Sequence, residues 1–341
     1  MRRKHIALIY TGGTIGMTQM VHGFAPMPNF PTVLDKLLLA YGDSMPQYTL
    51  HAYAKPIDSA NATPQDWQRI GRDIAARYKD YDGFVVLHGT DTMAYTAAAL
   101  SFMLQGLRKP VILTGSQIPL SAARSDASQN LITALQLAAS DEINEVAICF
   151  NQRLLRGNRA TKLSSEKWDA FDSPNYPHLA EIGIDVRLNL PALLPRAASE
   201  RFELPEYGEH AVLPIRFVPG LPMKMLQALL DLNPQAVILQ CYGSGNAPDS
   251  DPTLLDMLRR ASERGTVLVA CSQSPHGRVS VGAYAAGAGM TDAGVIGSSD
   301  MGFEAIYAKL HHLFALGLPG ETVRRELLRD ISGELSGELS A

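Results

Sequence analysis

The chain has 341 residues, of which 46% are apolar, and its formal net charge is −4. This length exceeds that of most single α/β cores, so we expect two domains. The small acidic charge argues against a nucleic-acid partner or an anionic membrane surface, and no apolar stretch approaches the roughly 20 residues that a membrane helix requires.

The first residues, MRRKHIALIY, combine a basic start with an apolar run, as an export signal does. The apolar run ends after about five residues, whereas a secretory signal requires ~7–15. It also leads directly into the turn at Gly12, so cleavage would remove a core strand. We therefore interpret Ile6–Tyr10 as a first β-strand and expect a cytoplasmic protein.

Short apolar runs then alternate with helical patterns, which is typical of parallel βαβ units. Thr63 and Asp66 have the spacing of a capping box around Pro64, and apolar residues recur at helical spacing from Trp67 to Tyr78. This predicts a helix that leads into buried strands. The strands expected next are Gly83–His88, Pro110–Thr114 and Val146–Phe150.

The periodicity fails from Pro191 to His210, where prolines and charged residues collect, and we interpret this segment as a linker. A helix opened by Asp251-Pro252 then lies among further expected strands, which are Ala236–Cys241, Thr266–Cys271 and Gly294–Gly297. The closing SGELSGELSA is expected to be a frayed tail. The boundaries predicted are residues 1–190 for a larger N-terminal α/β domain, 191–210 for the linker and 211–341 for a smaller C-terminal α/β domain.

The cysteines are odd in number, lie far apart and each belong to an apolar run: Cys149, Cys241 and Cys271. We expect buried reduced thiols without disulfides. The chain has no HExxH or CxxC motif, and neighbours such as His311 and His312 on a helix cannot face one ion. No metal site is therefore expected.

Ligands of open parallel sheets bind beyond the carboxyl ends of the strands. In this chain those ends are followed by glycines and hydroxyl-bearing residues, namely Gly12-Gly13-Thr14, Gly89-Thr90-Asp91-Thr92 and Gly115-Ser116-Gln117. A longer loop after the fourth expected strand reaches Lys162, and the second domain offers Asn246 within YGSGNAP.

These loops do not have the spacing of a phosphate site. No turn ends in the Gly-Lys-Ser/Thr of a P-loop, and Thr14 occupies the place of the second glycine in the dinucleotide fingerprint. Hydroxyls with one acid and one lysine instead suit covalent acyl transfer. Thr14 or Thr90 would attack a carbonyl, a lysine would manage the proton, and backbone amides would hold the oxyanion.

Each candidate also has a purely structural interpretation. Thr14, and Thr90 with Asp91, would cap the helices that follow their strands. Lys162 would be a solvated lysine, and His88 a packed core histidine. On pattern alone, an activated-hydroxyl hydrolase is only slightly favoured over a ligand-binding protein.

Several longer segments resemble the bacterial L-asparaginases of the cytoplasmic type I group: TGGTIGM, VVLHGTDTMAYTAAALSFML, VILTGSQIPLSAARSDASQNL, RLLRGNRATK and YGSGNAP. The resemblance spans nearly the whole chain. It implies cofactor-free hydrolysis of L-asparagine to L-aspartate and ammonia. It also implies two α/β domains, the larger with a flavodoxin-like parallel sheet, in a homo-oligomer that is a dimer or a dimer of dimers.

The resemblance further implies roles for single residues. Thr14 matches the nucleophile that forms an acyl-enzyme, and Thr90, Asp91 and Lys162 match a second catalytic group. Ser59 matches the residue that binds the α-carboxylate of the substrate, while Asp91 also binds its α-ammonium. The other substrate-binding positions are Gly13, Gly89 and Ser116, with Asn246 supplied by the neighbouring subunit.

Charge balance supports this assignment but leaves the lysine's role open. Asparagine is a zwitterion, so a serine hydroxyl with loop amides and an aspartate together suit its two charges. Asp91 beside Lys162 favours a charged lysine, which cannot act as a base. Either burial offsets the carboxylate, or the lysine polarises Thr90.

Two positions depart from the family. Members commonly carry a tyrosine in the loop after the first turn, where this chain has Phe24, so the activation of Thr14 is open; Tyr10 is a nearby phenol. Gln240 and Cys241 stand where some members have an effector-binding arginine, so we do not expect allostery.

Three other functions remain as alternatives. One is an amidohydrolase that prefers glutamine. Another is a subunit of a tRNA-dependent amidotransferase, which would need an RNA-binding surface that an acidic chain of this length does not suggest. The third is a non-catalytic amino-acid binding protein, which would usually carry an export signal.

Overall fold

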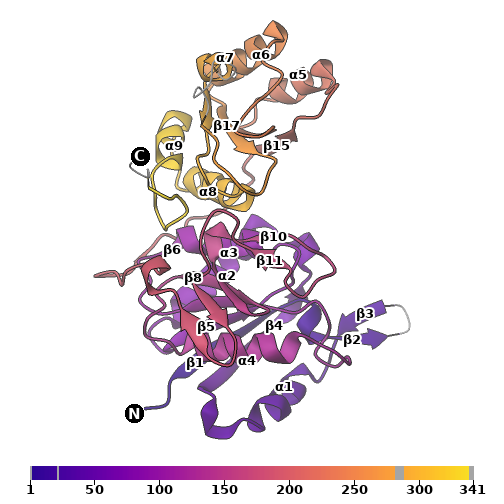
Figure 1. The fold of residues 1–341 in the computed structure, drawn as a ribbon, viewed down its shortest axis with the longest axis vertical. Coiled ribbons are helices and arrows are strands. Elements are labelled where there is room, and N and C mark those ends of the chain that lie inside the picture. Colours follow the sequence, from indigo (N-terminus) through magenta and orange to yellow (C-terminus); the bar gives the residue numbers. More distant parts are fainter. Residues whose placement is uncertain (1, 21–22, 281–287, 338–341) are drawn as a thin grey trace. The chain divides into compact units, whose positions relative to one another are not determined.

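The computed structural model describes residues 2–20, 23–280 and 288–337. The chain divides into two compact units, Met1–Leu204 and Pro205–Ala341, and each contains its own sheet (Figure 1). Among the described residues, none of the helices has the length and apolar character needed to cross a membrane.

The first unit is built on an eight-stranded sheet. From one edge to the other its strands are β13 (Val186–Leu188), β12 (Ala180–Ile182), β9 (Arg153–Arg156), β8 (Val146–Phe150), β7 (Val111–Thr114), β5 (Gly83–Leu87), β1 (His5–Gly12) and β4 (Gln47–Ile57). The strands from β8 to β4 pair in parallel. Counted along the chain from the β4 edge, they have the 2-1-3-4-5 order of flavodoxin-like sheets. The expected fold class is confirmed.

The strands expected from apolar runs in this unit all form, within two residues of their predicted ends. β4 was not predicted, because this edge strand (QYTLHAYAKPI) is only half buried and has no continuous apolar run. The antiparallel β9, β12 and β13, which extend the sheet beyond β8, were also not predicted.

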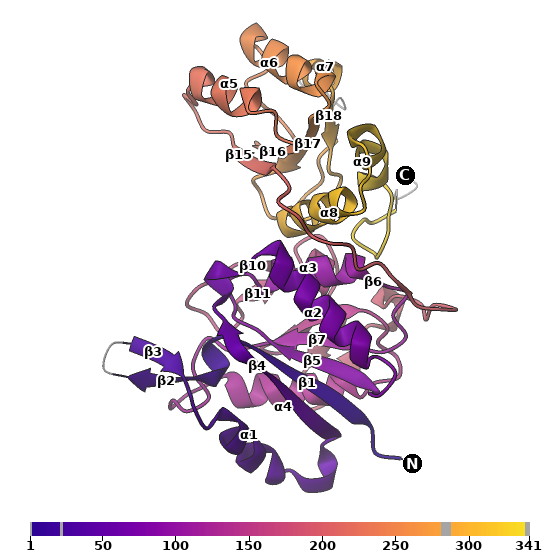
Figure 2. The same cartoon turned by 180° about the vertical axis from the view of Figure 1, so that it is seen from behind.

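Helices cover both faces of this sheet (Figures 1 and 2). α2 and α3 lie on one face, and α1 and α4 on the other. Ile6 and Leu8 of β1 are fully buried in the cluster that α1 and α4 complete, and each such side chain contributes about 1.5–3 kcal/mol. The helices are α1 (Phe30–Leu39), α2 (Pro64–Arg77), α3 (Met93–Met103) and α4 (Ala127–Ala138).

The predicted start of α2 is confirmed. The backbone N–H of Thr63 donates to Asp66 Oδ2 at 2.9 Å, and both halves of the capping box are present around Pro64. Trp67, Ile70 and Ile74 form the buried face of this helix, as their spacing predicted. Local sequence therefore determines both where this helix begins and which face it buries.

Short elements connect these layers. The single-turn helices are η1 (Thr14–Gly16), η2 (Gly42–Ser44), η3 (Ser59–Asn61), η4 (Gly157–Arg159) and η5 (Leu190–Ala192). The short antiparallel pairs are β2 (Met17–Met20) with β3 (Gly23–Pro26), β6 (Leu104–Gln105) with β14 (Arg201–Phe202), and β10 (Thr161–Lys162) with β11 (Phe171–Asp172).

The second unit has a four-stranded parallel sheet ordered β15 (Val212–Arg216), β16 (Ala236–Cys241), β17 (Val267–Ser272) and β18 (Val295–Gly297). One apolar cluster joins it to helices α5, α6 and α7, and another to α8 and α9. The helices are α5 (Met223–Asp231), α6 (Pro252–Glu263), α7 (Ala288–Asp292), α8 (Phe303–Ala315) and α9 (Gly320–Leu327). Asp251 caps α6 through Thr253 N, as predicted.

The cysteine prediction is also confirmed: the three thiols are free and buried. Cys241 and Cys271 lie on neighbouring strands but belong to different apolar clusters, on the two faces of their sheet. Burial raises the pKa of each thiol to about 12, so both stay protonated and unreactive at neutral pH.

The prediction of a frayed C-terminal tail is wrong for residues 332–336, while residues 338–341 lie outside the described chain. Glu334 is fully buried and accepts a hydrogen bond of 2.5 Å from Lys309 Nζ on α8. Lys309 also donates to the carbonyls of Leu327 and Arg329. Although burial alone would raise the pKa of Glu334, the Lys309 ammonium holds it below its ordinary value. This ion pair fastens the segment around Glu334 to α8.

Replacing Glu334 with glutamine tests the role of this ion pair in stability. Glu334→Gln removes the carboxylate that pairs directly with the buried Lys309 ammonium, so we expect the free energy of unfolding, measured in urea, to fall by about 3 kcal/mol. Glu321→Gln is the matched control, because the Glu321 side chain is 90% exposed, and it should cost less than about 0.5 kcal/mol. Equal effects of the two substitutions would show that the buried pair is not an anchor.

Candidate active site

Except for Lys162 on β10, the predicted site residues of the first unit lie on turns that follow four neighbouring parallel strands, β4, β1, β5 and β7. Ser59 begins η3 just beyond β4, and Thr14 begins η1 just beyond β1. Thr90 follows β5, and Ser116 follows β7. The strand order reverses between β1 and β5, and such a switch point is where sheets of this type bind their ligands.

The turns of Thr14 and Thr90 are in direct contact through two glycines. A Cβ at Gly13 would lie 2.5 Å from Gly89 N and 2.6 Å from Gly89 Cα, so no side chain fits between the turns. Gly13 also has φ +92°, a region that strongly favours glycine. The two hydroxyl-bearing residues therefore follow glycines whose backbones touch.

Ser59 joins this contact from the third turn. A Cβ at Gly89 would clash with the Ser59 hydroxyl and would lie 2.6 Å from Ser59 Cβ. Ser59 is only 5% exposed. The structure thus brings Gly13, Gly89 and Ser59 together at one end of the sheet, beside Thr14 and Thr90.

Thr90, Asp91 and Lys162 form one hydrogen-bonded group. Lys162 Nζ donates to Thr90 Oγ1 at 2.9 Å and to Asp91 Oδ1 at 2.7 Å. The Lys162 side chain is 19% exposed and that of Asp91 62% exposed, so the carboxylate stands at the open side of the group. β10, paired with β11, carries the lysine across to the β5 turn. The interpretation of Lys162 as a solvated surface lysine is wrong.

The capping interpretations of the threonines are also wrong. α3 begins at Met93 with Thr92 at its N-cap, so neither Thr90 nor Asp91 caps it. The N-cap position of η1 is Gly13, which leaves the Thr14 side chain without a capping role. Both threonine hydroxyls are therefore free of the structural task that their sequence positions suggested.

The phenol of Tyr10 has a structural role. Its ring packs against Phe30 with centroids 4.5 Å apart, and its hydroxyl occupies the space where a side chain at position 16 would stand. Burial raises the pKa of Tyr10. Phe24 lies on β3, opposite Gln19 of β2, with 55% of its surface exposed. Tyr10 thus supports the turn of Thr14 from beneath.

Ser116 is 1% exposed, and its hydroxyl has no hydrogen-bond partner within the described chain. Its turn is held from behind by Asp126, whose carboxylate accepts the backbone N–H groups of Gln117 and Ile118 at 2.9 and 3.0 Å. Asn130 adds a hydrogen bond to the carbonyl of the preceding Gly115. The backbone of this turn is fixed by buried side chains.

Gln117 belongs to the site although the sequence assigned it no role. Its Oε1 accepts a hydrogen bond of 3.4 Å from Thr90 Oγ1, and its Nε2 donates to the carbonyl of Lys167 at 3.2 Å. Its position directly after Ser116 was the only sequence signal. The side chain ties the Thr90 turn to the loop that follows Lys162.

His88 is a buried core residue, as predicted. Its Nδ1–H donates to the Gly89 carbonyl at 2.8 Å, which leaves Nε2 to accept from Thr96 Oγ1 at 3.0 Å. Burial lowers the pKa of His88, so the ring is neutral. It supports the β5 turn from within the core.

Asn246, the predicted site residue of the second unit, lies on an exposed turn after β16. Two backbone hydrogen bonds of 2.8 Å between Tyr242 and Asn246 close this turn, and Gly243 and Gly245 have positive φ. Ser272 Oγ donates to the Gly243 carbonyl at 2.7 Å. The turn presents Asn246 at the surface of its unit.

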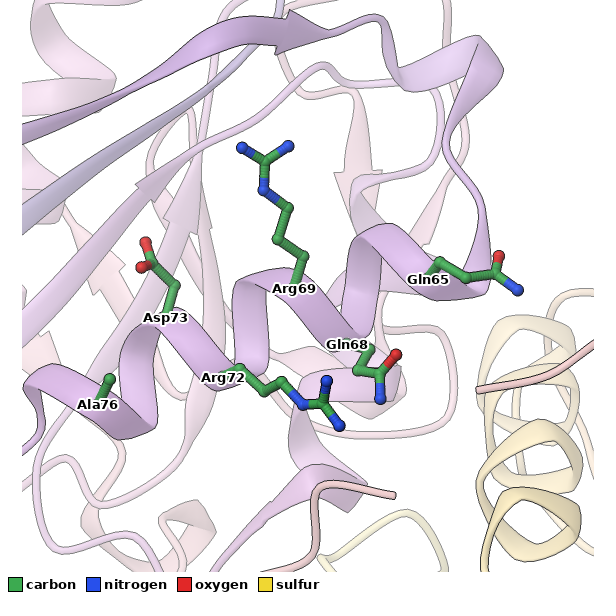
Figure 3. A pocket seen from close by; sticks show the side chains of 6 residues that line it. All are labelled: Gln65, Gln68, Arg69, Arg72, Asp73 and Ala76. Carbon is green, nitrogen blue, oxygen red and sulfur yellow. The ribbon is translucent and has the colours of Figure 1, made fainter. Parts of the chain in front are cut away.

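A separate shallow hollow lies along α2 (Figure 3). Its lining contains none of the predicted site residues: Gln65, Gln68, Arg69, Arg72, Asp73 and Ala76. Figure 3 shows the Arg69 and Asp73 side chains pointing to one side of the helix and Gln68 and Arg72 to the other. Over the described residues, no group of three or more His, Cys, Asp or Glu side chains could hold a metal ion.

The similarity to known proteins extends over nearly the whole chain. Residues 5–193 match the family model "Asparaginase, N-terminal", and residues 211–327 match "Glutaminase/Asparaginase C-terminal domain". L-asparaginase 1 of Escherichia coli (strain K12) is 46% identical over 338 residues, which cover 98% of this chain and 99% of that protein.

Two solved structures have the same fold. L-asparaginase I from Vibrio cholerae O1 biovar eltor str. N16961 is 43% identical, with a TM-score of 0.91 over 98% of this chain and 100% of that chain. The thermostable L-asparaginase from Thermococcus kodakarensis is 32% identical, with a TM-score of 0.86 over the same shares.

The contact between Gly13 and Gly89 can be tested by its effect on stability. Gly13→Ala forces a Cβ into the Gly89 backbone, and it also places alanine at the positive φ of position 13. We therefore expect the free energy of unfolding to fall by more than about 3 kcal/mol. Gly23→Ala is the control in the same unit, since Gly23 has φ +112° but no atom of the described residues comes within 4 Å of an added Cβ. It should cost only the backbone strain, about 1–3 kcal/mol, and therefore less than Gly13→Ala, which adds a clash to the same kind of strain. Equal losses in a urea titration would contradict a close contact.

Proposed function

The chain belongs to the asparaginase family, and we propose that it is an L-asparagine amidohydrolase that forms L-aspartate and ammonia. The observation that carries this proposal is the backbone contact of Gly13 with Gly89, which lets Thr14 and Thr90 act on one small substrate. The proposed catalytic residues are Thr14, Thr90, Asp91 and Lys162.

Recognition of the substrate requires both signs of charge around a small site. We propose that the Ser59 hydroxyl and nearby backbone N–H groups bind the α-carboxylate, while the exposed Asp91 carboxylate binds the α-ammonium. Backbone groups at Gly13, Gly89 and Ser116 would contact the rest of the substrate, since glycine allows a close approach. Both charged ends would then be held while the side-chain amide lies between the threonines.

In the first step, Thr14 Oγ attacks the amide carbon and forms a C–O bond. The carbonyl electrons collapse back as the C–N bond breaks, and the nitrogen leaves as ammonia with the proton that Thr14 loses. The product is an aspartyl ester of Thr14. Backbone N–H groups of the glycine turns would stabilise the oxyanion formed on the way.

In the second step, a water molecule replaces ammonia, and the ester is hydrolysed to L-aspartate and free Thr14. We propose that Thr90 orients this water. Lys162 Nζ donates a hydrogen bond to Thr90 Oγ1 and lies against the Asp91 carboxylate, which supports a charged lysine that polarises Thr90. Of the two roles left open by the sequence, we propose polarisation, because the Asp91 carboxylate lies 2.7 Å from Lys162 Nζ.

We further propose a cytoplasmic homo-oligomer, a dimer or a dimer of dimers, in which Asn246 completes the site of the neighbouring subunit. Support comes from the exposed position of Asn246 on a turn closed by its own backbone hydrogen bonds. The fixed backbone of such a turn would present the Asn246 side chain to another surface. Activity would then depend on assembly.

Ammonia release from purified protein tests the proposed function directly. We expect turnover with L-asparagine and a lower kcat/KM with L-glutamine. A higher kcat/KM with L-glutamine would instead establish the glutaminase alternative. Binding of L-asparagine without ammonia release would establish the amino-acid binding alternative and overturn the proposal.

Removal of either threonine hydroxyl should stop turnover. We expect Thr14→Ala and Thr90→Val each to lower kcat at least about 10³-fold, because each removes a group that acts on the reacting carbon or its water. Thr49→Val is the control, since Thr49 lies on β4 of the same sheet and bonds His5. Its kcat should stay within about twofold of the original. Near-normal kcat in either site variant would refute the role proposed for that threonine.

Phe24 on β3 allows the opposite kind of test, in which a hydroxyl is added instead of removed. If the missing phenol limits the attack by Thr14, Phe24→Tyr should raise kcat about tenfold or more, in the range of acid–base catalysis. The comparison is made at saturating L-asparagine. An unchanged kcat would show that Thr14 is activated without a phenol at this position.

A further inference from the structure

The hydroxyl of Thr92 makes a hydrogen bond that is unusual for a residue at a helix N-cap. Thr92 is the N-cap residue of α3, and its side chain makes no capping hydrogen bond. A threonine at an N-cap ordinarily accepts an N–H of its own helix. Here Thr92 Oγ1 donates to the backbone carbonyl of Ser59, 33 residues away in sequence, at 2.7 Å. The hydroxyl is diverted from its own helix to the Ser59 turn.

The Ser59 turn is held from two sides. Asp58 accepts hydrogen bonds from Ala60 N at 3.2 Å and Asn61 Nδ2 at 2.8 Å, which closes η3 on its exposed side. Thr92 holds the opposite side, through the Ser59 peptide itself. With its carbonyl fixed, the Ser59 side chain lies against Gly89, next to the Gly13 contact.

Thr92 also belongs to the turn that carries the second catalytic group. It lies two residues after Thr90 and directly after Asp91, so its hydrogen bond links that turn to Ser59. This hydrogen bond sets the distance between the Ser59 hydroxyl, which is proposed to bind the α-carboxylate, and Thr90, which is proposed to act at the reacting amide. A small error in this spacing would shift the whole substrate, because L-asparagine has few rotatable bonds.

We propose that Thr92 is a positioning residue for the substrate: its hydroxyl holds the Ser59 peptide so that the Ser59 side chain meets the α-carboxylate. This inference rests on the proposed function and on the role of Ser59 in it. Thr92 touches neither the substrate nor the reacting atoms. Loss of the Thr92 hydroxyl weakens the binding of the substrate α-carboxylate. The α-carboxylate is bound equally in the ground state and the transition state, so KM changes more than kcat.

The test compares variants that keep or remove the hydroxyl. Thr92→Val and Thr92→Ala remove it, and Thr92→Ser keeps it. With L-asparagine as substrate, we expect the first two to raise KM about tenfold with kcat within about threefold, and the serine variant to stay near the original KM. The inhibition constant of L-aspartate, which carries the same α-carboxylate, should rise in parallel.

Thr266→Val is the matched control. Thr266 Oγ1 donates to the Pro234 carbonyl at 2.9 Å, so this variant loses a hydrogen bond of the same kind in the second unit. It should lower the melting temperature without changing KM. A raised KM here, as large as that of Thr92→Val, would mean that KM reports general destabilisation, and would overturn the inference.

Two outcomes separate this inference from the proposed function. If the original protein releases ammonia and Thr92→Val and Thr92→Ala have its KM, the positioning role is wrong while the function stands. If the original protein releases no ammonia, the proposed function fails. The dissociation constant of L-aspartate, measured by calorimetry on the original and the Thr92 variants, then decides the positioning role: equal constants overturn it, and a rise of about tenfold supports it.

Discussion

The site depends on one steric constraint, the side-chain-free contact of Gly13 with Gly89 at the switch point of the first sheet. β1 and β5 are neighbours, so the turns that follow them must share the space beyond their carboxyl ends. A methyl group at Gly13 would enter the Gly89 backbone, and one at Gly89 would clash with Ser59. The proposed chemistry needs both threonine hydroxyls close to one small substrate, and the glycine at position 13 allows the two turns to approach so closely.

The polar groups around this contact are held by hydrogen bonds that cross between turns. Lys162 reaches Thr90 and Asp91 from β10, and Thr92 reaches the Ser59 carbonyl from the start of α3. Groups held by such hydrogen bonds are fixed before a substrate arrives, so little free energy is lost in ordering them on binding. The same arrangement leaves the Asp91 carboxylate exposed, while Lys162 and Ser59 are largely covered.

Sequence patterns predicted those helices and strands whose signals are local in sequence or repeat at regular spacing. Buried strands appeared as apolar runs, and the capping box at Thr63 predicted the start of α2 because its hydrogen bonds join residues three apart. The edge strand β4 lacked such a run. Glu334 looked like part of a polar tail because its partner, Lys309, lies 25 residues earlier, on α8. Thr90 and Asp91 looked like caps for the corresponding reason: their partner Lys162 lies more than 70 residues away.

The central claim is that Thr14 forms the covalent intermediate while the Thr90 group resolves it. The most direct measurement mixes Thr90→Val protein with L-asparagine, quenches the mixture in acid and locates any aspartyl ester by peptide mass spectrometry. The account predicts an ester on the peptide that contains Thr14, and none in a Thr14→Ala,Thr90→Val double variant. An ester on any other residue, or none in the Thr90→Val protein, would contradict it.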